Sequence, residues 1–359
     1  MASPYKVSVI IPLLPEHRFS QGCLESLAEQ SFRDFDVIFV DAGISSDFLE
    51  MLMEQSRSLG LSSYWVHDHR ESIPILRNRG ILESRSEYVA FHNYPDIMLP
   101  SRLEKGVRLL EHRPDLILSS SPVELLETDG RGRPRSDSPS RHSKLWSESE
   151  RMLEALMKRT APLGKMAEGY HIPEATTITV RRAAILDAGL YDTRFSVTPW
   201  ATIELSIRLY HQGSFERIRT PQVKKIFKAN KMSSEEWIPS MEQMDLFYLI
   251  LSWHSGTNPD RETTRLLRIF RTHWLRYWSG CFFRYRTGRQ FGIRLALRAL
   301  FGNFLCLESW RWMIKSFFPQ SHYPKLFWFE EFIESPIPTH MIKSRIGQIL
   351  SSEWKLTCL

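Results

Sequence analysis

Short apolar runs alternate with helix-spaced apolar positions over the first 120 residues. The runs at residues 6–12, 36–40, 63–67, 88–91 and 116–119 predict five strands. The first of them, KVSVIIP, is continuous and rich in β-branched residues, which is typical of a strand covered on both faces. Neighbouring parallel strands need a crossover between them. The alternation therefore predicts an α/β fold with a doubly wound, mostly parallel sheet and helices on both faces.

The stretch EYVAFHNYPDIMLP, residues 87–100, ends one of these strands abruptly. Its apolar letters run through Phe91 and stop at the segment HNYPD, after which apolar positions at helical spacing resume. Open α/β sheets bind ligands where the carboxyl ends of strands meet the starts of helices, because backbone and side-chain groups converge there. We therefore expect a functional site at residues 92–96.

The composition changes twice along the rest of the chain. Residues 129–143, DGRGRPRSDSPSRHS, are rich in glycine, arginine, proline and serine and predict a flexible, solvated insertion. After about residue 240 the pattern is mostly helical, over residues 241–254, 259–278, 290–307 and 309–318. The sequence thus predicts two domains, an α/β domain at residues 1–239 and a basic, aromatic-rich helical region at residues 240–359.

Positive charge is concentrated in the helical region. The formal net charge is +6, and residues 261–300 hold ten arginines and a single acid, Glu262. Aromatic residues interleave with these arginines. The mixture suits an anionic membrane surface with aromatic side chains at headgroup level, or a helical bundle with an aromatic core and solvated arginines. No recognised nucleic-acid-binding motif accompanies the charge, so we expect no nucleic acid partner.

The cysteines and the lengths of the apolar runs indicate where in the cell the protein is expected to be. Four cysteines are scattered without metal-like spacing, which favours reduced thiols in a cytoplasm over a disulfide framework. The best apolar runs, residues 246–253 and 299–307, are about half the roughly 20 residues that a membrane-spanning helix needs. We expect a cytoplasmic protein that is soluble or peripheral on the inner face of the membrane.

Six segments between about Lys6 and Ser234 carry a family resemblance by their order and spacing. They are VSVIIP, CLESLAEQSFRDFDVIFVDAG, LRNRGI, EYVAFHNYPDIMLPSRLEKGV, VRRAAILDAGLYDTRF and IELSIRLYHQGSF. Together they resemble the family 2 glycosyltransferases, nucleotide-sugar-dependent enzymes with the GT-A fold that are abundant in bacteria. The resemblance implies a nucleotide-diphosphate sugar as donor and a surface polysaccharide or another glycan, or a lipid-linked molecule, as acceptor.

The residues that carry chemistry in this family are largely replaced here. The metal-binding DxD motif matches residues 93–95, NYP, and the second aspartate after the second strand, which grips the base, is Ala42. The acidic pair that supplies the catalytic base matches Ala201 and Thr202. The resemblance implies Mn²⁺ or Mg²⁺, whereas these letters predict no metal site. Proline has no ligating side chain, and asparagine is a weak ligand for a hard cation.

The positions that still match the family are Asp41, Arg77, Asn78, Arg79 and Asp96. From the placement of the motifs we predict six residues for nucleotide-sugar binding: Pro12, Asp41, Arg77, Asn78, Asn93 and Asp96. Inverting sugar transfer also needs a base to take the proton of the acceptor hydroxyl. Two residues are candidates for that catalytic role, Glu204 just beyond the substituted pair and His171 where an acceptor loop would run.

Most of these candidates also have a structural interpretation. Asp96 is a displaced metal ligand or the N-cap of the following helix, and Asp41 holds a ribose or caps the helix after Gly43. Arg77 and Arg79 contact phosphates or lie on a solvated helix face.

Two further residues are ambiguous in the same way. His92 is spaced to share a metal with Asp96, but it continues a buried strand, which favours a core histidine with a satisfied hydrogen bond. Glu204 is a base or an acid on a helix surface.

The sequence leaves two functions open. One is sugar transfer from a nucleotide-diphosphate donor with the metal and base positions substituted. The other is a catalytically inactive pseudo-glycosyltransferase that acts as a binding or scaffold partner in glycan assembly. The complete scaffold supports the first, and the simultaneous loss at metal, base and nucleobase positions supports the second.

Overall fold

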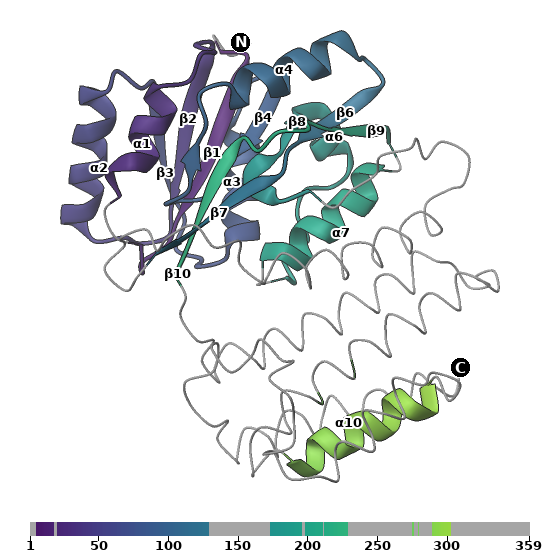
Figure 1. Cartoon of the computed structure of the whole chain (residues 1–359). Helices are drawn as coiled ribbons and strands as arrows, with labels where there is room; N and C mark the ends of the chain where they lie inside the picture. The colour runs from purple at the N-terminus through teal and green to yellow at the C-terminus, as the bar shows by residue number, and fades with distance from the viewer. Residues whose placement is uncertain are drawn as a thin grey trace. The chain divides into compact units, whose positions relative to one another are not determined.

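The computed structural model describes residues 5–17, 20–128, 173–195, 198–210, 212–228 and 289–302, together with residues 275 and 279 (Figure 1). The chain divides into two compact units, Met1–Ser140 with Ala161–Lys228, and Arg141–Thr160 with Ala229–Leu359. The predicted domain boundary at residues 239 and 240 stays a prediction. The predicted insertion at residues 129–143 and most of the predicted C-terminal helices lie outside the described residues.

Strands and helices alternate through the first unit. The elements described in it are β1 (Val7–Leu13), α1 (Gln21–Ala28), β2 (Phe35–Asp41), α2 (Ser46–Ser58), β3 (Ser63–His67), α3 (Ile73–Glu83), β4 (Tyr88–Phe91), β5 (Ile97–Met98), α4 (Arg102–His112), β6 (Leu116–Ser120), β7 (Val123–Thr128), the 3₁₀ helix η1 (Ala175–Thr177), β8 (Thr179–Arg181), α6 (Arg182–Asp187), α7 (Thr198–Tyr210), β9 (Ser214–Arg217) and β10 (Val223–Lys228). In the second unit the structure describes α10 (Arg289–Gly302).

Two sheets organise the described part of this unit. The larger has seven strands in the order β3-β2-β1-β4-β8-β6-β9, in which β8 alone runs antiparallel to its neighbours. The smaller has the order β5-β10-β7, with β10 antiparallel to β5 and parallel to β7. The predicted doubly wound, mostly parallel sheet is confirmed. Residues 175–177 form η1, and the strand β8 begins at Thr179.

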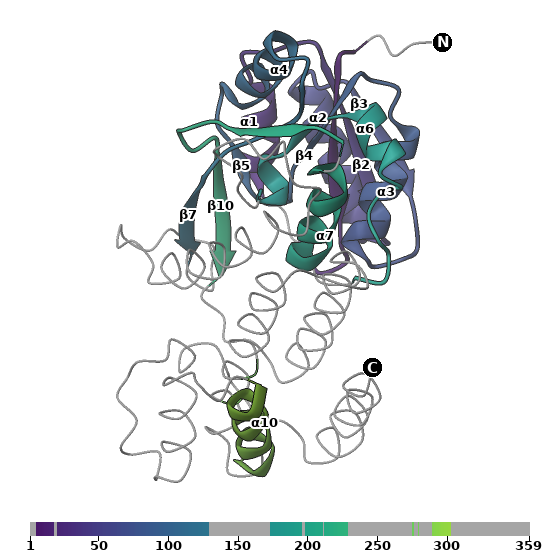
Figure 2. The same cartoon turned by 90° about the vertical axis from the view of Figure 1, so that its right-hand side faces the viewer.

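Helices cover both faces of the larger sheet (Figures 1 and 2). Alternate residues of β1, from Val7 to Leu13, share one hydrophobic core with residues of α1, α2 and α4. Ile10 faces the other side, where α3 packs against the sheet. A Cβ on Gly80 of α3 would lie 2.5 Å from Ile10 Cγ2, so only glycine permits this close approach. The tight packing fixes the position of α3, the helix that carries Arg77 and Asn78.

Candidate functional site

The carboxyl ends of three parallel strands define one edge of the larger sheet. Leu13 at the end of β1 lies opposite Asp41 at the end of β2, and Ile10 of β1 lies opposite Phe91 at the end of β4. The predicted site at residues 92–96 follows β4 directly, so it shares this edge with the turn after β2. This is the edge at which an open α/β sheet binds ligands.

The Asp41 carboxylate is tied into the protein through both oxygens. Its Oδ1 accepts hydrogen bonds from the N–H groups of Gly43, at 2.9 Å, and Ile44, at 2.8 Å. Its Oδ2 lies 2.9 Å from Nδ1 of His67, whose Nε2 lies 3.1 Å from Nδ1 of His69. Gly43 has a φ of 98°, a conformation that favours glycine. The helix-cap interpretation of Asp41 is wrong, because Ser45 is the N-cap of α2. Asp41 instead holds the turn before that helix, and it contacts His67 at the end of β3.

Asn93 is held at both its backbone and its side chain. Its N–H donates to Oγ1 of Thr176 at 3.3 Å, and its Oδ1 accepts from Nη2 of Arg77 at 2.7 Å. An arginine side chain has only donors, so the amide oxygen must be the atom that faces it. The Nδ2 group of Asn93 therefore points away from Arg77.

Arg77 is fully buried, so its interpretation as a residue of a solvated helix face is wrong. Its guanidinium lies 5.5 Å from the ring centroid of Phe91 and 5.4 Å from that of Tyr191. The Nε and Nη1 atoms are buried without a hydrogen-bond partner. No carboxylate among the described residues forms an ion pair with Arg77. By contrast, Arg79 is exposed and pairs with Glu83 at 2.7 Å, one helical turn away.

Asp96 lies inside the protein with 3% of its surface exposed. Its Oδ1 accepts from the N–H of Ile226 in β10 at 3.0 Å. The N-cap interpretation is wrong, because Ser101 occupies the N-cap position of α4. Burial raises the pKa of Asp96 to about 6, against the opposing effect of the Ile226 hydrogen bond.

His92 is a core histidine, as its place in the strand pattern favours. The ring is fully buried, and its Nε2 lies 3.0 Å from the carbonyl oxygen of Asp96. Burial, with the nearby charge of Arg102, lowers the pKa of His92 to about 3. The ring is therefore neutral at physiological pH.

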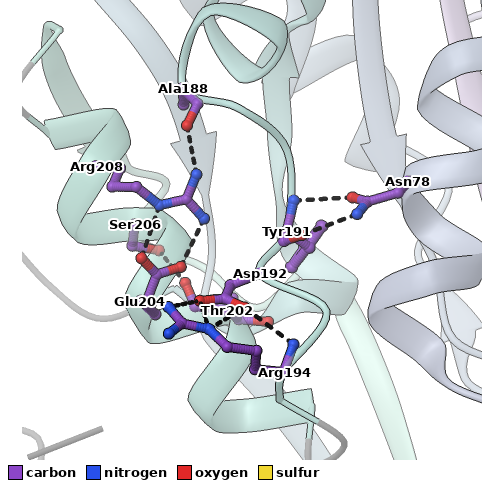
Figure 3. Close-up of polar contacts among 9 residues, drawn as sticks. All are labelled: Asn78, Ala188, Tyr191, Asp192, Arg194, Thr202, Glu204, Ser206 and Arg208. Carbon is purple, nitrogen blue, oxygen red and sulfur yellow. Dashed lines mark hydrogen bonds and ion pairs between the residues drawn. The ribbon is translucent and has the colours of Figure 1, made fainter. Parts of the chain in front are cut away.

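Asn78 clamps the segment that follows α6 (Figure 3). Its Nδ2 donates to the carbonyl oxygen of Tyr191 and its Oδ1 accepts from the N–H of Tyr191, each at 2.8 Å. The two preceding residues, Gly189 and Leu190, have φ angles of 86° and 68°. A leucine in this left-handed region is strained, and the clamp holds the backbone there. Asn78 thus uses its oxygen and one amide hydrogen within the protein.

Glu204 is buried and bound to an arginine (Figure 3). Its Oε1 and Oε2 accept from Nε and Nη2 of Arg208 at 2.7 and 2.6 Å, and Arg208 also donates to the carbonyl oxygen of Ala188. With 3% of Glu204 exposed, its interpretation as a surface acid is wrong. The i,i+4 spacing of the two residues was a readable signal for the pair.

A second carboxylate nearby is paired in the same way. Asp192 receives bonds from Nε and Nη2 of Arg194, at 3.0 and 2.5 Å to its Oδ2 (Figure 3). Burial alone would raise the pKa of Asp192, but the hydrogen bonds and charge of Arg194 outweigh it and hold the pKa below its usual value. Both acids of this segment therefore lie in contact with an arginine.

The substituted base position is buried beside Tyr191. Thr202 is 2% exposed, and Ser206 donates to its carbonyl oxygen at 2.7 Å (Figure 3). Burial raises the pKa of the Tyr191 hydroxyl, while the neighbouring Arg77 and Thr202 side chains act in the opposite direction. Tyr191 thus lies beside both Arg77, which binds Asn93, and Thr202. No sequence signal predicted this role of Tyr191.

The remaining predicted residues add little to the geometry. Pro12 is a buried residue of β1 opposite Val40, and His171 lies outside the described residues. Within the described ranges, no group of three or more His, Cys, Asp or Glu side chains is arranged to hold a metal ion.

Comparison with known families shows which proteins this domain is similar to. Residues 8–171 match the family described as Glycosyl transferase family 2. The match and the sheet order together show that this part of the chain is similar to the family 2 glycosyltransferases. The resemblance found in the sequence is confirmed.

A curated relative shares a short part of this domain. An uncharacterized glycosyltransferase of Rickettsia bellii (strain RML369-C) is 26% identical over 126 residues, which make up 35% of this chain and 18% of that protein. Across the first three curated relatives, the match spans between 18% and 35% of the relative's own length.

Solved structures share the fold over a longer range. The mannosyltransferase PcManGT from Pyrobaculum calidifontis, in complex with GDP-Man and Mn²⁺, has a TM-score of 0.52 and 14% identity over 88% of this chain and 81% of its own. S. aureus TarS 1-349, in complex with UDP-GlcNAc, has a TM-score of 0.51 and 15% identity over 87% of this chain and 89% of its own. These likenesses confirm the predicted GT-A fold.

A membrane-crossing segment is absent from the described part of the chain. None of the helices there combines the length and the apolar character that crossing a membrane requires.

Proposed function

We propose that the α/β domain binds a nucleotide-diphosphate sugar at the carboxyl edge of β1, β2 and β4, and transfers the sugar to a surface-polysaccharide or lipid-linked acceptor. The observation that carries this proposal is the buried guanidinium of Arg77, held against Asn93 at this edge. Sugar transfer needs positive charge near the departing diphosphate. Two proteins of this fold, PcManGT and TarS, were solved with GDP-Man and UDP-GlcNAc, which supports a donor of this class.

The missing part of the machinery is the base. Thr202 does not ionise at neutral pH, and the carboxylates of Glu204 and Asp192 are each bound by an arginine. Transfer through Glu204 requires its release from Arg208. Otherwise the base comes from outside the described residues, where His171 is the candidate.

The paired carboxylates also favour a second function. A site whose acids are neutralised by arginines binds a donor without deprotonating an acceptor. On this alternative the chain is a catalytically inactive pseudo-glycosyltransferase that serves as a binding or scaffold partner in glycan assembly.

Calorimetry followed by a turnover assay separates the two functions. The full chain is titrated with UDP, GDP, UDP-GlcNAc and GDP-Man, and the best ligand is then incubated at high protein concentration while released nucleotide is measured. We expect micromolar binding of at least one nucleotide. Release of nucleotide supports transfer, and binding without release supports the scaffold function. If none of the four ligands binds, both are contradicted.

The location stays a prediction. A cytoplasmic protein, peripheral on the inner face of the membrane through its arginine-rich helices, suits a lipid-linked acceptor. Of those helices the structure describes α10, whose buried hydrophobic residues are Leu295, Ala296, Ala299 and Leu300.

A further inference from the structure

In this chain Asn93 stands in the motif that binds the metal in the family, and it lies next to a buried positive charge, Arg77. We propose that Asn93 presents amide N–H donors to the diphosphate of the ligand, and that Arg77 behind it supplies the positive charge in place of a divalent cation. This inference rests on the proposed function, because it concerns how the same edge binds the donor.

The orientation of the Asn93 amide is fixed by its partner. Oδ1 accepts from Nη2 of Arg77 at 2.7 Å, and the backbone N–H is bound to Thr176, so the side chain cannot turn over without placing two donors face to face. Asn93 is half-buried, and no described residue accepts a hydrogen bond from its Nδ2. The exposed end of this side chain is therefore a pair of N–H donors.

A Mn²⁺ or Mg²⁺ ion does not fit the motif. Hard cations need oxygen ligands, and the side chains at the three motif positions offer no free carboxylate. The oxygen of Asn93 accepts from Arg77, the hydroxyl oxygen of Tyr94 accepts from the N–H of Ser20, and Pro95 has no ligating side chain. Asp96 is 3% exposed, and its Oδ1 is bound to Ile226. A metal ion on the oxygen of Asn93 would also lie beside the guanidinium that donates to it.

The surrounding charges leave Arg77 uncompensated. His92 is neutral, and Glu174 pairs with Lys225 at 2.9 Å. Both oxygens of Asp41 accept bonds from its own turn and from His67. Arg77 has no carboxylate partner within the described residues, and two of its donor atoms are buried without a hydrogen bond. A bound anion would therefore provide the negative counter-charge that Arg77 lacks among the described residues.

Arg77 acts through Asn93. The guanidinium is 0% exposed, so it does not meet solvent or a ligand directly. A hydrogen bond from a charged donor polarises the amide that accepts it, and in a low-dielectric interior this strengthens the amide's own N–H groups as donors. Arg77 thus makes the N–H groups of Asn93 stronger hydrogen-bond donors to a ligand, although Arg77 itself is buried.

Binding of inorganic pyrophosphate in EDTA tests this polarity without requiring a nucleotide. Calorimetry is done on the full chain as wild type and as Asn93→Ala, Asn93→Asp and Ser58→Asp. Asn93→Ala removes the donors, and Asn93→Asp turns them into a carboxylate that neutralises Arg77. Ser58→Asp is the matched control, since it adds the same charge to an exposed residue at the end of α2.

We expect wild type to bind pyrophosphate in EDTA, Asn93→Ala to bind about tenfold more weakly, and Asn93→Asp at least as weakly as Asn93→Ala. Ser58→Asp should match wild type within about twofold. Wild type should also leave the electron paramagnetic resonance signal of free Mn²⁺ unchanged. Each variant's far-ultraviolet circular dichroism verifies its fold.

The outcomes separate this inference from the proposed function. The inference is overturned if wild type binds neither pyrophosphate nor any nucleotide in EDTA, if binding appears only with Mn²⁺, or if Asn93→Asp binds as well as wild type. If pyrophosphate binds as expected but UDP, GDP and their sugars bind no better, the proposed function fails while the anion site stands.

Discussion

The loop after β4, residues 91–98, and the segment from α6 to α7, residues 188–208, distribute charge in opposite ways. On the proposed function they are the donor-side loop and the acceptor-side segment. Behind the donor-side loop a buried arginine of α3, Arg77, binds the amide of Asn93 and has no carboxylate partner among the described residues. In the acceptor-side segment the carboxylates of Glu204 and Asp192 each have an arginine of their own. The donor-side loop therefore lies against an arginine without a carboxylate partner, whereas the acceptor-side segment holds carboxylates that are each paired with an arginine.

This difference separates binding from chemistry. A buried cation without a counter-charge destabilises the fold and is relieved by an anionic ligand, so the donor-side loop favours a ligand. A carboxylate in a two-pronged ion pair is a poor proton acceptor, so the acceptor-side segment favours stability over base catalysis. Each of the following variants tests one side of this contrast.

The largest expected effect is on the acceptor-side pair. Glu204→Leu leaves the charge of Arg208 without its partner in a largely buried place, where 21% of the arginine side chain is exposed. Breaking a buried pair typically costs 3–5 kcal/mol, and the partial exposure of Arg208 puts the expected loss at about 3 kcal/mol. Urea denaturation measures the free energy of unfolding.

The double variant Glu204→Leu with Arg208→Leu is the control, since it removes both charges. It should recover most of the loss. A double variant as unstable as the single one would show that packing, and not the unpaired charge, makes Glu204 important.

The next effect concerns the pH dependence of stability. The pKa of Asp96 is raised to about 6 in the folded protein, so the fold binds a proton that the unfolded chain releases at lower pH. Stability contributed by this group is therefore present below about pH 4 and is lost as pH rises through about 6, a change of roughly 3 kcal/mol. Asp96→Asn is neutral throughout, so its stability relative to wild type should rise by this amount between pH 4 and pH 7.

Asp192→Asn is the matched comparison, because the pKa of Asp192 is lowered. A lowered pKa contributes stability at neutral pH that is lost on acidification. Asp192→Asn should therefore be less stable than wild type at pH 7, and the difference should shrink at pH 4. Thermal unfolding across this range measures both. Equal signs for the two variants would contradict the contrast between the regions.

The smallest expected effect on stability comes from Arg77→Met. Removing an uncompensated buried charge should leave the thermal midpoint unchanged or raise it slightly, while pyrophosphate affinity in EDTA falls at least tenfold. Arg79→Met, two residues along the same helix, removes an exposed arginine and should change neither quantity appreciably. A large loss of stability in Arg77→Met alone would mean that the guanidinium chiefly supports packing.

The scaffold of the domain could be predicted from the sequence, because its signals are local. Continuous apolar runs specify buried parallel strands, and the elbow after Phe91 marks the edge of the sheet. The antiparallel β8 was not predictable in this way, because it pairs with β4 and β6 across a long stretch of chain. Its three residues also carry too short a pattern to set a direction.

The partners of the candidate residues were harder to predict than the residues themselves. An arginine such as Arg77 favours a solvated face on composition, and only tertiary packing against Phe91 and Tyr191 buries it. Asp96 precedes a helix as a cap would, yet its hydrogen bond reaches Ile226, 130 positions along the chain. Contacts between residues so far apart in the chain produce no repeating pattern of hydrophobic and polar residues from which they could be predicted.

Helix α3 joins the two regions mechanically. Consecutive residues of a helix point about 100° apart, so Arg77 binds the donor-side loop while Asn78 clamps the acceptor-side backbone at Tyr191. One turn of α3 therefore sets the position of both Asn93 and Tyr191. A substitution that shifts this turn would move both segments together.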